Sequence, residues 1–142
     1  ERRSENSSLP LKVLLGARRK SLLIGHQGFL DLGVDTGLAT DDGSAGHHGN
    51  VIELLEQEME QLGPDAEIAG IGCGPHGMNV ALRDIAVEIQ LKFWISLENY
   101  MPCGFGACFG CVIAGPEDGP LRYRRVCVEG PCFSVEELPA HF

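Results

Sequence analysis

Short apolar segments alternate with amphipathic ones in the first two thirds of the chain. Residues 11–17 form a short, mainly apolar run, which is typical of a buried strand, and residues 34–39 and 66–71 are predicted as two further strands, each followed by turn-forming residues. Over residues 91–97 the apolar positions have the period of two that a half-buried strand requires; they are Leu91, Phe93, Ile95 and Leu97. The pattern therefore predicts four strands, with Phe93 and its neighbour Trp94 in the core.

Two further segments have the period of an amphipathic helix. After Asn50, apolar residues recur at spacings of three, four and three, at Ile52, Leu55, Met59 and Leu62. Asn50 is a suitable N-cap, Glu53 completes a capping box, and the Gly-Pro pair at 63–64 ends the helix. A second helix is predicted over 76–90, with a buried face made of Val80, Leu82, Ile85, Ala86 and Ile89. Residues 20–32 are ambiguous and compatible with a short helix.

The order of these elements indicates the fold class. Strands and helices alternate up to residue 97, which favours a parallel sheet covered by helices. Beyond that point Pro, Gly and Cys dominate and the helical period is lost. We predict an α/β domain over residues 11–97, followed by a small cysteine-rich module with a β-hairpin over residues 98–142.

Composition narrows the classes of function. The 142 residues give room for one ordinary domain, and 11 Lys and Arg against 20 Asp and Glu give a net charge of −9. This acidity argues against nucleic acid or an anionic membrane as a partner, because phosphate binding needs excess Lys and Arg. No apolar run approaches the roughly 20 residues of a membrane-spanning helix, and no signal peptide is recognisable. We expect a cytoplasmic protein.

Cysteines carry the strongest chemical signal. Four of the six form a C-x4-C-x2-C run and a later single cysteine, namely Cys103, Cys108, Cys111 and Cys127. This is the spacing of plant-type [2Fe–2S] ferredoxins. Because four thiolates must converge on two irons, the loop has to curl, which glycines permit; they are Gly104, Gly106 and Gly110. Phe105 and Phe109 are expected to shield the cluster from water.

The fourth ligand follows from the turn-forming residues between 115 and 120. A hairpin centred near Gly119 would place residue 111 opposite residue 127, because their mean is 119. Cys127 is therefore predicted to return beside Cys111. Cys132 lies beyond the hairpin and is the weaker candidate.

Two other interpretations of the cysteines remain open. A structural zinc site is one, although such sites usually contain two separated pairs of closely spaced ligands, whereas here a compact triad is followed by a single cysteine. Disulfide bonds or free thiols are the other. A zinc-stabilised interaction module is accordingly a rival function from a different class.

The cysteine segment and several loops resemble the electron-transfer subunit of type B dihydroorotate dehydrogenase, within the ferredoxin-reductase-like flavoproteins. The resemblance covers about residues 11–138. Its most specific stretches are MPCG at 101–104, CFGCV at 108–112, YRRVC at 123–127 and GP at 130–131. Weaker ones lie at 15–18, 39–47, 72–78 and 95–98.

This resemblance implies an electron relay. In such subunits NADH reduces FAD, and single electrons pass through the [2Fe–2S] cluster to or from FMN in a partner subunit that oxidises dihydroorotate in pyrimidine biosynthesis. By the same match, the four cysteines are the cluster ligands. The nicotinamide loop would contain Gly72, Cys73, Gly74 and Pro75, and a loop beside the same pocket Thr40, Asp41, Asp42, Gly43 and Ser44.

The match also sets an expectation about completeness. The family's N-terminal FAD barrel and the first strand of its NAD domain have no counterpart in these residues. We therefore expect a partial ferredoxin-reductase-like sheet with the cluster module, acting as an electron-transfer component rather than a complete catalyst. A subunit of another NAD(P)H-linked oxidoreductase, such as a hydrogenase-type diaphorase, is the alternative within this class.

Two sets of charged residues each allow a structural and a functional interpretation. Asp41 and Asp42 form either a solvated turn or a carboxylate pair for acid–base or metal chemistry. A basic run is either a solvated strand face or a docking surface near the cluster; it consists of Arg122, Arg124 and Arg125.

Overall fold

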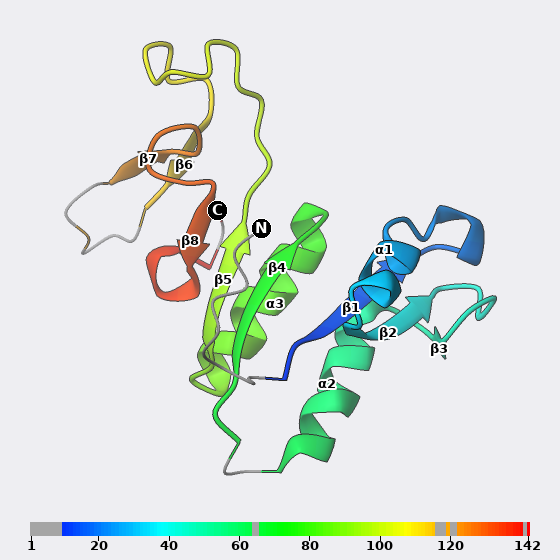
Figure 1. Ribbon diagram of the computed structural model, residues 1–142. Helices are drawn as coiled ribbons and strands as arrows, with labels where there is room; N and C mark the ends of the chain where they lie inside the picture. Colours follow the sequence, from blue (N-terminus) through cyan, green and yellow to red (C-terminus); the bar gives the residue numbers. More distant parts are fainter. Residues whose placement is uncertain (1–9, 64–65, 116–118, 120–121, 141) are drawn as a thin grey trace. The chain divides into compact units, whose positions relative to one another are not determined.

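The computed structural model describes residues 10–63, 66–115, 119, 122–140 and 142. It divides into two compact units, Glu1–Asp65 and Ala66–Phe142, each of which is a small α/β assembly (Figure 1). The α/β class predicted from the alternation of strands and helices is confirmed. Among the described residues, no helix combines the length and the apolar character that crossing a membrane requires.

The first unit is built on a three-stranded parallel sheet. Its strands are β1 (Lys12–Ala17), β2 (Asp35–Thr40) and β3 (His47–His48), in the order β1-β2-β3. In the register, Lys12 is opposite Asp35 and Ala17 is opposite Thr40. The strands predicted at 11–17 and 34–39 are thus confirmed. Residues 20–32 contain the 3-10 helix η1 (Lys20–Leu22) and the short helix α1 (His26–Asp31).

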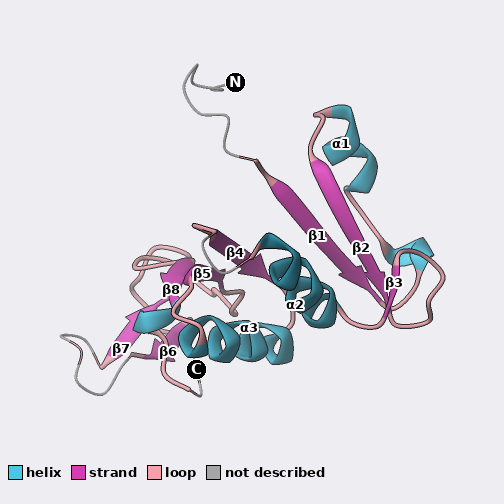
Figure 2. Ribbon diagram, turned by 90° about the horizontal axis from the view of Figure 1, so that it is seen from below, coloured by secondary structure: helices cyan, strands magenta, loops and turns pink. Residues whose placement is uncertain are grey.

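Two helices cover opposite faces of this sheet (Figure 2). Helix α2 (Val51–Leu62) packs closely on strand β1 at Gly16, where an added Cβ would lie 2.7 Å from the Cβ of Val51. Helix α1 contacts the other face, where His26 Nε2 lies 3.1 Å from Thr36 Oγ1. Close packing on one face therefore depends on a position without a side chain.

Helix α2 begins directly after Asn50, as predicted, and three residues of its predicted apolar face, Ile52, Leu55 and Met59, are half-buried. Leu54, outside that face, is buried, whereas Leu62 at its end is 57% exposed. Leu54 packs toward Gly37 of β2 in the same way as Val51 packs toward Gly16. The two strand glycines therefore select the buried face of the helix, a cause that the helical period alone does not reveal.

The second unit contains a mixed sheet in the order β4-β5-β8. Strands β4 (Ala69–Cys73) and β5 (Lys92–Ser96) are parallel, and β8 (Cys132–Ser134) pairs antiparallel with β5. The last strand of the cysteine-rich segment thus completes a sheet that begins before residue 98. The division of the chain at residue 98 stays a prediction.

Strand β4 extends further than the sequence predicts. Gly72 and Cys73, expected in a tight turn after a strand over 66–71, pair with Ile95 and Ser96 of β5. The ladder stops before Pro75, which has no N–H to donate. Helix α3 (His76–Glu88) follows directly, as predicted.

The buried residues of this unit confirm the period of two in β5, but two residues predicted to be buried, Trp94 and Ile89, are exposed. Phe93, Ile95 and Leu97 are buried, but Trp94, which was expected in the core, is 39% exposed because adjacent strand residues point to opposite faces. Ile89 is also exposed, since α3 ends at Glu88. The other buried apolar residues include Leu82, Ala86, Phe133, Val135 and Leu138.

The predicted hairpin is present with a register one residue away from the expected one. Strands β6 (Val112–Ala114) and β7 (Tyr123–Arg125) are antiparallel, with Val112 opposite Arg125. Residue 111 is therefore level with residue 126, and Val126 N donates to Cys111 O at 3.1 Å. Part of the connection, residues 116–118 and 120–121, lies outside the described residues.

The N-terminal cap of α2 gives a direct test of the first unit. Asn50 Oδ1 accepts hydrogen bonds from the backbone N–H groups of Ile52 (2.9 Å) and Glu53 (3.1 Å). Replacing Asn50 by Ala should lower the free energy of unfolding by about 1 kcal/mol, because these N–H groups lose their acceptor. Urea titration followed by circular dichroism measures the change, with Glu56→Ala in the exposed middle of α2 as the control. Equal stability of the two variants would contradict the assigned cap.

Candidate cluster-binding site

The hairpin brings two of the predicted ligands together. Cys111 directly precedes β6, and Cys127 lies in the turn after β7. Their sulfur atoms are 3.2 Å apart, far longer than a disulfide bond of about 2.05 Å. The predicted return of Cys127 beside Cys111 is therefore found, although through the turn after β7 rather than through direct opposition in the ladder.

These two thiols share one hydrogen bond and are unequal. The backbone N–H of Cys127, 3.5 Å from Cys111 Sγ, and then the Cys127 thiol lower the pKa of Cys111. Hydrogen bonding to Cys111, followed by burial, raises the pKa of Cys127. Cys111 is 2% exposed, so the sulfur that ionises first is enclosed by protein.

Cys103 and Cys108 form a second pair in the irregular segment between β5 and β6. Backbone N–H groups of Cys108 and Phe105, and then the Cys108 side chain, hydrogen-bond Cys103 Sγ and lower the pKa of Cys103 to about 6. The Ala107 N–H contributes to the same effect. The loop therefore directs successive amide dipoles at one sulfur, which stabilises negative charge there.

Glycines make this curl possible, as predicted for two of the three positions. Gly104 and Gly106 have φ of +72° and +88°, in the region that residues with a side chain rarely adopt. Gly110 has a different role, because an added Cβ there would lie 2.8 Å from Pro102. Phe109 also has a positive φ, +55°. The loop thus carries backbone strain that its contacts must offset.

The donor set fits a two-iron cluster better than a single zinc ion. The four thiols stand as two pairs, 103 with 108 and 111 with 127, and the charges of Cys103 and Cys127 interact. No three Cys, His, Asp or Glu side chains of the described residues come close enough to hold one metal ion. A structural zinc ion needs four ligands around one point, whereas each iron of a [2Fe–2S] cluster takes two thiolates.

Cys73 and Cys132 lie elsewhere in the second unit. Both are opposite Ser96 in the β4-β5-β8 sheet, one on each side, and both are exposed. Nearby, Leu97 N donates a hydrogen bond to Pro131 O at 2.9 Å, which joins the beginning and the end of the cysteine-rich segment.

The aromatic side chains of the loop do not match their expected role. Phe105 and Phe109 are 76% and 64% exposed, so the described chain does not enclose them over the sulfur atoms. Phe109 lies under the guanidinium of Arg125, 5.5 Å from its ring centroid. A cation near the ring face accounts for its position.

Two of the three arginines of the basic run form ion pairs with glutamates of the same chain. They therefore match neither the solvated strand face nor the docking surface that the sequence suggested. Arg124 Nη1 donates to Glu137 Oε1 at 2.7 Å, and Arg125 pairs with Glu129 through two nitrogens. Hydrogen bonds from Arg125 lower the pKa of Glu129 to about 2. The sequence places Arg125 in the basic run but does not indicate its pairing; the available signal is an acidic residue, Glu129, four positions later.

The predicted nucleotide residues of the first unit form a turn after β2 that is hydrogen-bonded to the end of β1 and to the segment after it: Asp41 N donates to Ala17 O, and Ser44 Oγ accepts from Lys20 N. Thr40 is buried, and its hydroxyl donates to Ala45 O and accepts from Ala45 N. Asp42 Oδ1 accepts from Ser44 N at 3.0 Å, and hydrogen bonding to Ser44 lowers the pKa of Asp42. Asp41, Gly43 and Ser44 are exposed. A ligand role for this turn stays a prediction.

The second predicted nucleotide segment lies in the other unit, at the junction of β4 and α3. Gly74 O accepts from Asn79 Nδ2 at 2.9 Å, and Pro75 is the N-cap residue of α3. Asn79 is 3% exposed, and its Oδ1 has no hydrogen-bond partner among the described residues. The burial of Asn79 was not predicted from the sequence, although this residue is spaced three and seven positions from Leu82 and Ala86 on the buried face of α3. The ligand role of Gly72, Cys73, Gly74 and Pro75 is also untested.

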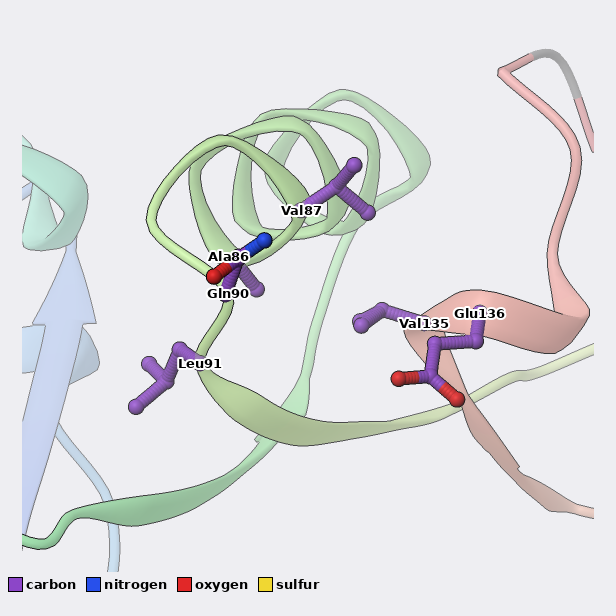
Figure 3. A pocket seen from close by; sticks show the side chains of 6 residues that line it. All are labelled: Ala86, Val87, Gln90, Leu91, Val135 and Glu136. Atoms are coloured by element: carbon purple, nitrogen blue, oxygen red, sulfur yellow. The ribbon is translucent and has the colours of Figure 1, made fainter.

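A groove of ≈ 290 Å³ lies between the end of α3 and η2 (Val135–Glu137), away from the cysteines in sequence. Its walls are mainly aliphatic, with one amide and one carboxylate; Figure 3 shows Ala86, Val87, Gln90, Leu91, Val135 and Glu136 around it. None of the predicted site residues contributes to this lining, so we assign it no chemistry.

The lowered pKa of Cys103 predicts an unusual reactivity in the reduced, metal-free chain. With a pKa of about 6, the thiol is ionised in about nine molecules of ten at pH 7. Alkylation of Cys103 by iodoacetamide should rise less than about twofold above pH 7 and fall about tenfold per unit well below pH 6. Mass spectrometry of the Cys103 peptide measures the rate. A rate that still rises tenfold between pH 7 and 8 would contradict the loop geometry.

Comparison with known proteins agrees with this geometry. Residues 98–139 match the family model described as the iron–sulfur cluster binding domain of dihydroorotate dehydrogenase B. The match contains all four cysteines of the two pairs. The prediction of an iron–sulfur site is therefore confirmed for the domain.

Curated relatives extend the similarity to most of the chain. The electron transfer subunit of dihydroorotate dehydrogenase B (NAD(+)) from Caldanaerobacter subterraneus subsp. tengcongensis is 38% identical over 128 residues, 90% of this chain and 49% of the relative. The subunit from Enterococcus faecalis is 40% identical over 126 residues, 87% of this chain and 46% of the relative. The chain thus spans about half the length of these relatives.

A solved structure supports the fold. It is described as the NADH-dependent reduced ferredoxin-NADP oxidoreductase, studied for flavin-based electron bifurcation. The TM-score is 0.66 at 29% identity, over 89% of this chain and 43% of that one. The resemblance inferred from the cysteine motif is confirmed: residues 98–139 match the iron–sulfur cluster binding domain of dihydroorotate dehydrogenase B, and the chain as a whole is similar to about half of that enzyme's electron transfer subunit.

Proposed function

We propose that this chain is an electron-transfer component in which Cys103, Cys108, Cys111 and Cys127 hold a [2Fe–2S] cluster. The observation that carries the proposal is the arrangement of these thiols as two pairs, with loop N–H groups directed at the sulfurs. When bound, such a cluster accepts and releases one electron at a time. The residues 98–142 are proposed to act as its binding module.

The chain's own residues would hold and tune this group. Amide N–H groups at 105, 107 and 108 stabilise negative charge on Cys103, and the Cys127 N–H does the same for Cys111. Such hydrogen bonds to sulfur are a main means by which a protein sets a reduction potential. The buried Cys111 and the exposed Cys108 leave the two ends of the site unequally open to solvent.

The electron source is proposed from the relatives. Their name contains NAD(+), and the neighbour's description contains NADH and flavin. We propose that the segments 40–44 and 72–75 take part in binding NAD(H) beside FAD.

An FMN-containing subunit that oxidises dihydroorotate is the proposed partner, since the relatives are named as subunits of that enzyme. Exposed apolar side chains around the cysteine loop suit such a contact; they are Tyr100, Met101, Phe105, Phe109, Tyr123 and Val128. A cytoplasmic location is proposed on the six free cysteines, which suit a reducing compartment.

One observation favours a second partner class. One solved structure similar to this chain is described as a ferredoxin-NADP oxidoreductase rather than a dihydroorotate dehydrogenase. A subunit of another NAD(P)H-linked oxidoreductase, such as a diaphorase, is therefore the alternative with the same cluster. A zinc-stabilised interaction module is the rival proposal from a different class.

Serine substitutions test the ligand set. After reconstitution with iron and sulfide, Cys108→Ser should lose most of the visible absorption of the cluster, because one iron loses a thiolate. Cys132→Ser is the matched control and should retain it, since Cys132 lies in β8 opposite Ser96. A spectrum unchanged by Cys108→Ser, or lost on Cys132→Ser, would contradict the assignment. Colourless wild-type protein with bound zinc would refute the cluster itself.

Co-purification tests the partner. The chain, coexpressed with an FMN-containing dihydroorotate-oxidising subunit, should form a complex in which dihydroorotate bleaches the cluster absorption. The chain alone should show no bleaching by dihydroorotate. A cluster-loaded chain that binds no such subunit but is reduced by a ferredoxin-dependent or hydrogenase-type partner would favour the alternative.

A further inference from the structure

One side chain of helix α3 reaches back to the segment that precedes the helix. Asn79 lies at the end of the first turn of α3, and its Nδ2 donates to Gly74 O at 2.9 Å. Its backbone N–H donates to Pro75 O at 3.0 Å. Two successive carbonyl groups of the bend between β4 and α3 are therefore held by the same residue.

The bend is restrained from other sides as well. Pro75, the N-cap residue of α3, has a φ of −56°, which its ring fixes. An added Cβ on Gly74 would lie 2.8 Å from Met78 Sδ, so the Met78 side chain packs directly against the Gly74 backbone. The conformation of the bend thus depends on the proline ring, on Met78 and on the side chain of Asn79.

The hydrogen bond to Gly74 is made at a cost to stability. Because a carbonyl oxygen can only accept, the Asn79 amide turns its NH2 group toward Gly74. Its Oδ1 is left buried, without a donor from any residue that the structure describes, and such an acceptor destabilises the folded chain. Leu82 and Ala86 occupy the same buried helix face without this cost. Stability alone therefore does not account for an asparagine at position 79.

The backbone that Asn79 holds belongs to residues 72–75, the nucleotide segment proposed above to bind NAD(H). Within it Cys73 and Pro75 are exposed, and Gly74 is half-buried. The segment lies at the carboxyl end of β4, and ligands of open α/β sheets bind outside the carboxyl ends of the strands. Asn79 is 3% exposed, so it acts on a ligand only through the backbone that it holds.

We propose that Asn79 is a positioning residue for the nucleotide segment: by holding the carbonyl of Gly74, it keeps residues 72–75 in the conformation that binds NAD(H). This inference rests on the proposed binding of NAD(H) by these residues. Preorganisation of this kind raises affinity, because the segment loses less conformational freedom when the ligand binds. Asn79 thus contributes to affinity without touching the nucleotide.

Arg83 supplies a matched control on the same helix. Its Nε donates to the backbone carbonyl of Leu138 at 3.4 Å, so it also makes a side-chain hydrogen bond from α3 to a carbonyl. That carbonyl belongs to the residue after η2 and not to the bend before α3. Weakened packing around α3 would affect variants at both positions, whereas a change in the bend would affect only variants at Asn79.

The experiment measures NADH binding to the full chain by isothermal titration calorimetry, and stability by urea unfolding. Asn79→Leu, which keeps the approximate size of the side chain, should weaken NADH binding about threefold to tenfold, the value of one hydrogen bond. Its urea midpoint should equal or exceed that of wild type, because the unpaired acceptor is removed. Arg83→Gln should bind NADH as wild type does. A purely structural role of Asn79 predicts the opposite, a lower midpoint with unchanged affinity.

A measurement on the wild-type chain does not depend on the folding of any variant. Coupling between two events is reciprocal, so a hydrogen bond that strengthens NADH binding must itself be strengthened by NADH. Saturating NADH should therefore slow the exchange of the Asn79 side-chain NH2 protons in NMR spectra. The NH2 protons of Gln57, on the exposed side of α2, should exchange as before.

Equal affinity of Asn79→Leu and wild type, or an equal loss of affinity in Asn79→Leu and Arg83→Gln, would overturn the proposal. Unchanged exchange of the Asn79 NH2 protons on NADH binding would also overturn it. Wild-type protein that binds no NADH would refute the proposed nucleotide segment itself and, with it, the role of Asn79.

Discussion

On the proposed function, four sulfur atoms must carry negative charge in a small volume, and this imposes the main constraint on the second unit. Like charges repel, so the chain has to supply compensating dipoles at short range. It does so with backbone N–H groups, which requires an irregular loop rather than a helix or strand whose amides are already paired. The positive φ angles at Gly104, Gly106 and Phe109 are consequences of this requirement.

The regular structure around the loop serves to hold it. The β6–β7 hairpin sets Cys111 next to the turn with Cys127, and the buried Val126 anchors that turn between them. Strand β8 joins the end of the module to the same sheet as β4 and β5. Strain in the loop is thus balanced by contacts on both sides, and Cys111 and Cys127 lie side by side without a disulfide bond.

Much of this could be predicted from the sequence, because its strongest signals are local. The capping box at Asn50, the alternation of Phe93, Ile95 and Leu97, and the cysteine spacing each depend on neighbours within a few residues. Features that depend on distant partners were missed or misplaced. The buried face of α2 is selected by Gly16 and Gly37, the exposure of Trp94 by its side of the sheet, and the hairpin register by one residue of turn geometry. From the sequence, Arg125 is only a member of a basic run. Its partners, the Gly106 carbonyl and the Glu129 carboxylate, become apparent only when the loop and the turn are folded together.

The pairing of Ser96 with Cys132 has a consequence for how the unit is built. Residues opposite each other in antiparallel strands have Cα atoms only about 5 Å apart, and Leu97 N to Pro131 O closes the same end. The chain therefore leaves the sheet at residue 97 and returns to it at residue 131 at two points that lie side by side. A two-residue β-turn could connect strands β5 and β8 at this end. The segment that carries Cys103, Cys108, Cys111 and Cys127 is thus an insertion between two adjacent strands of one sheet, anchored outside its own ends by the ion pair of Arg124 with Glu137.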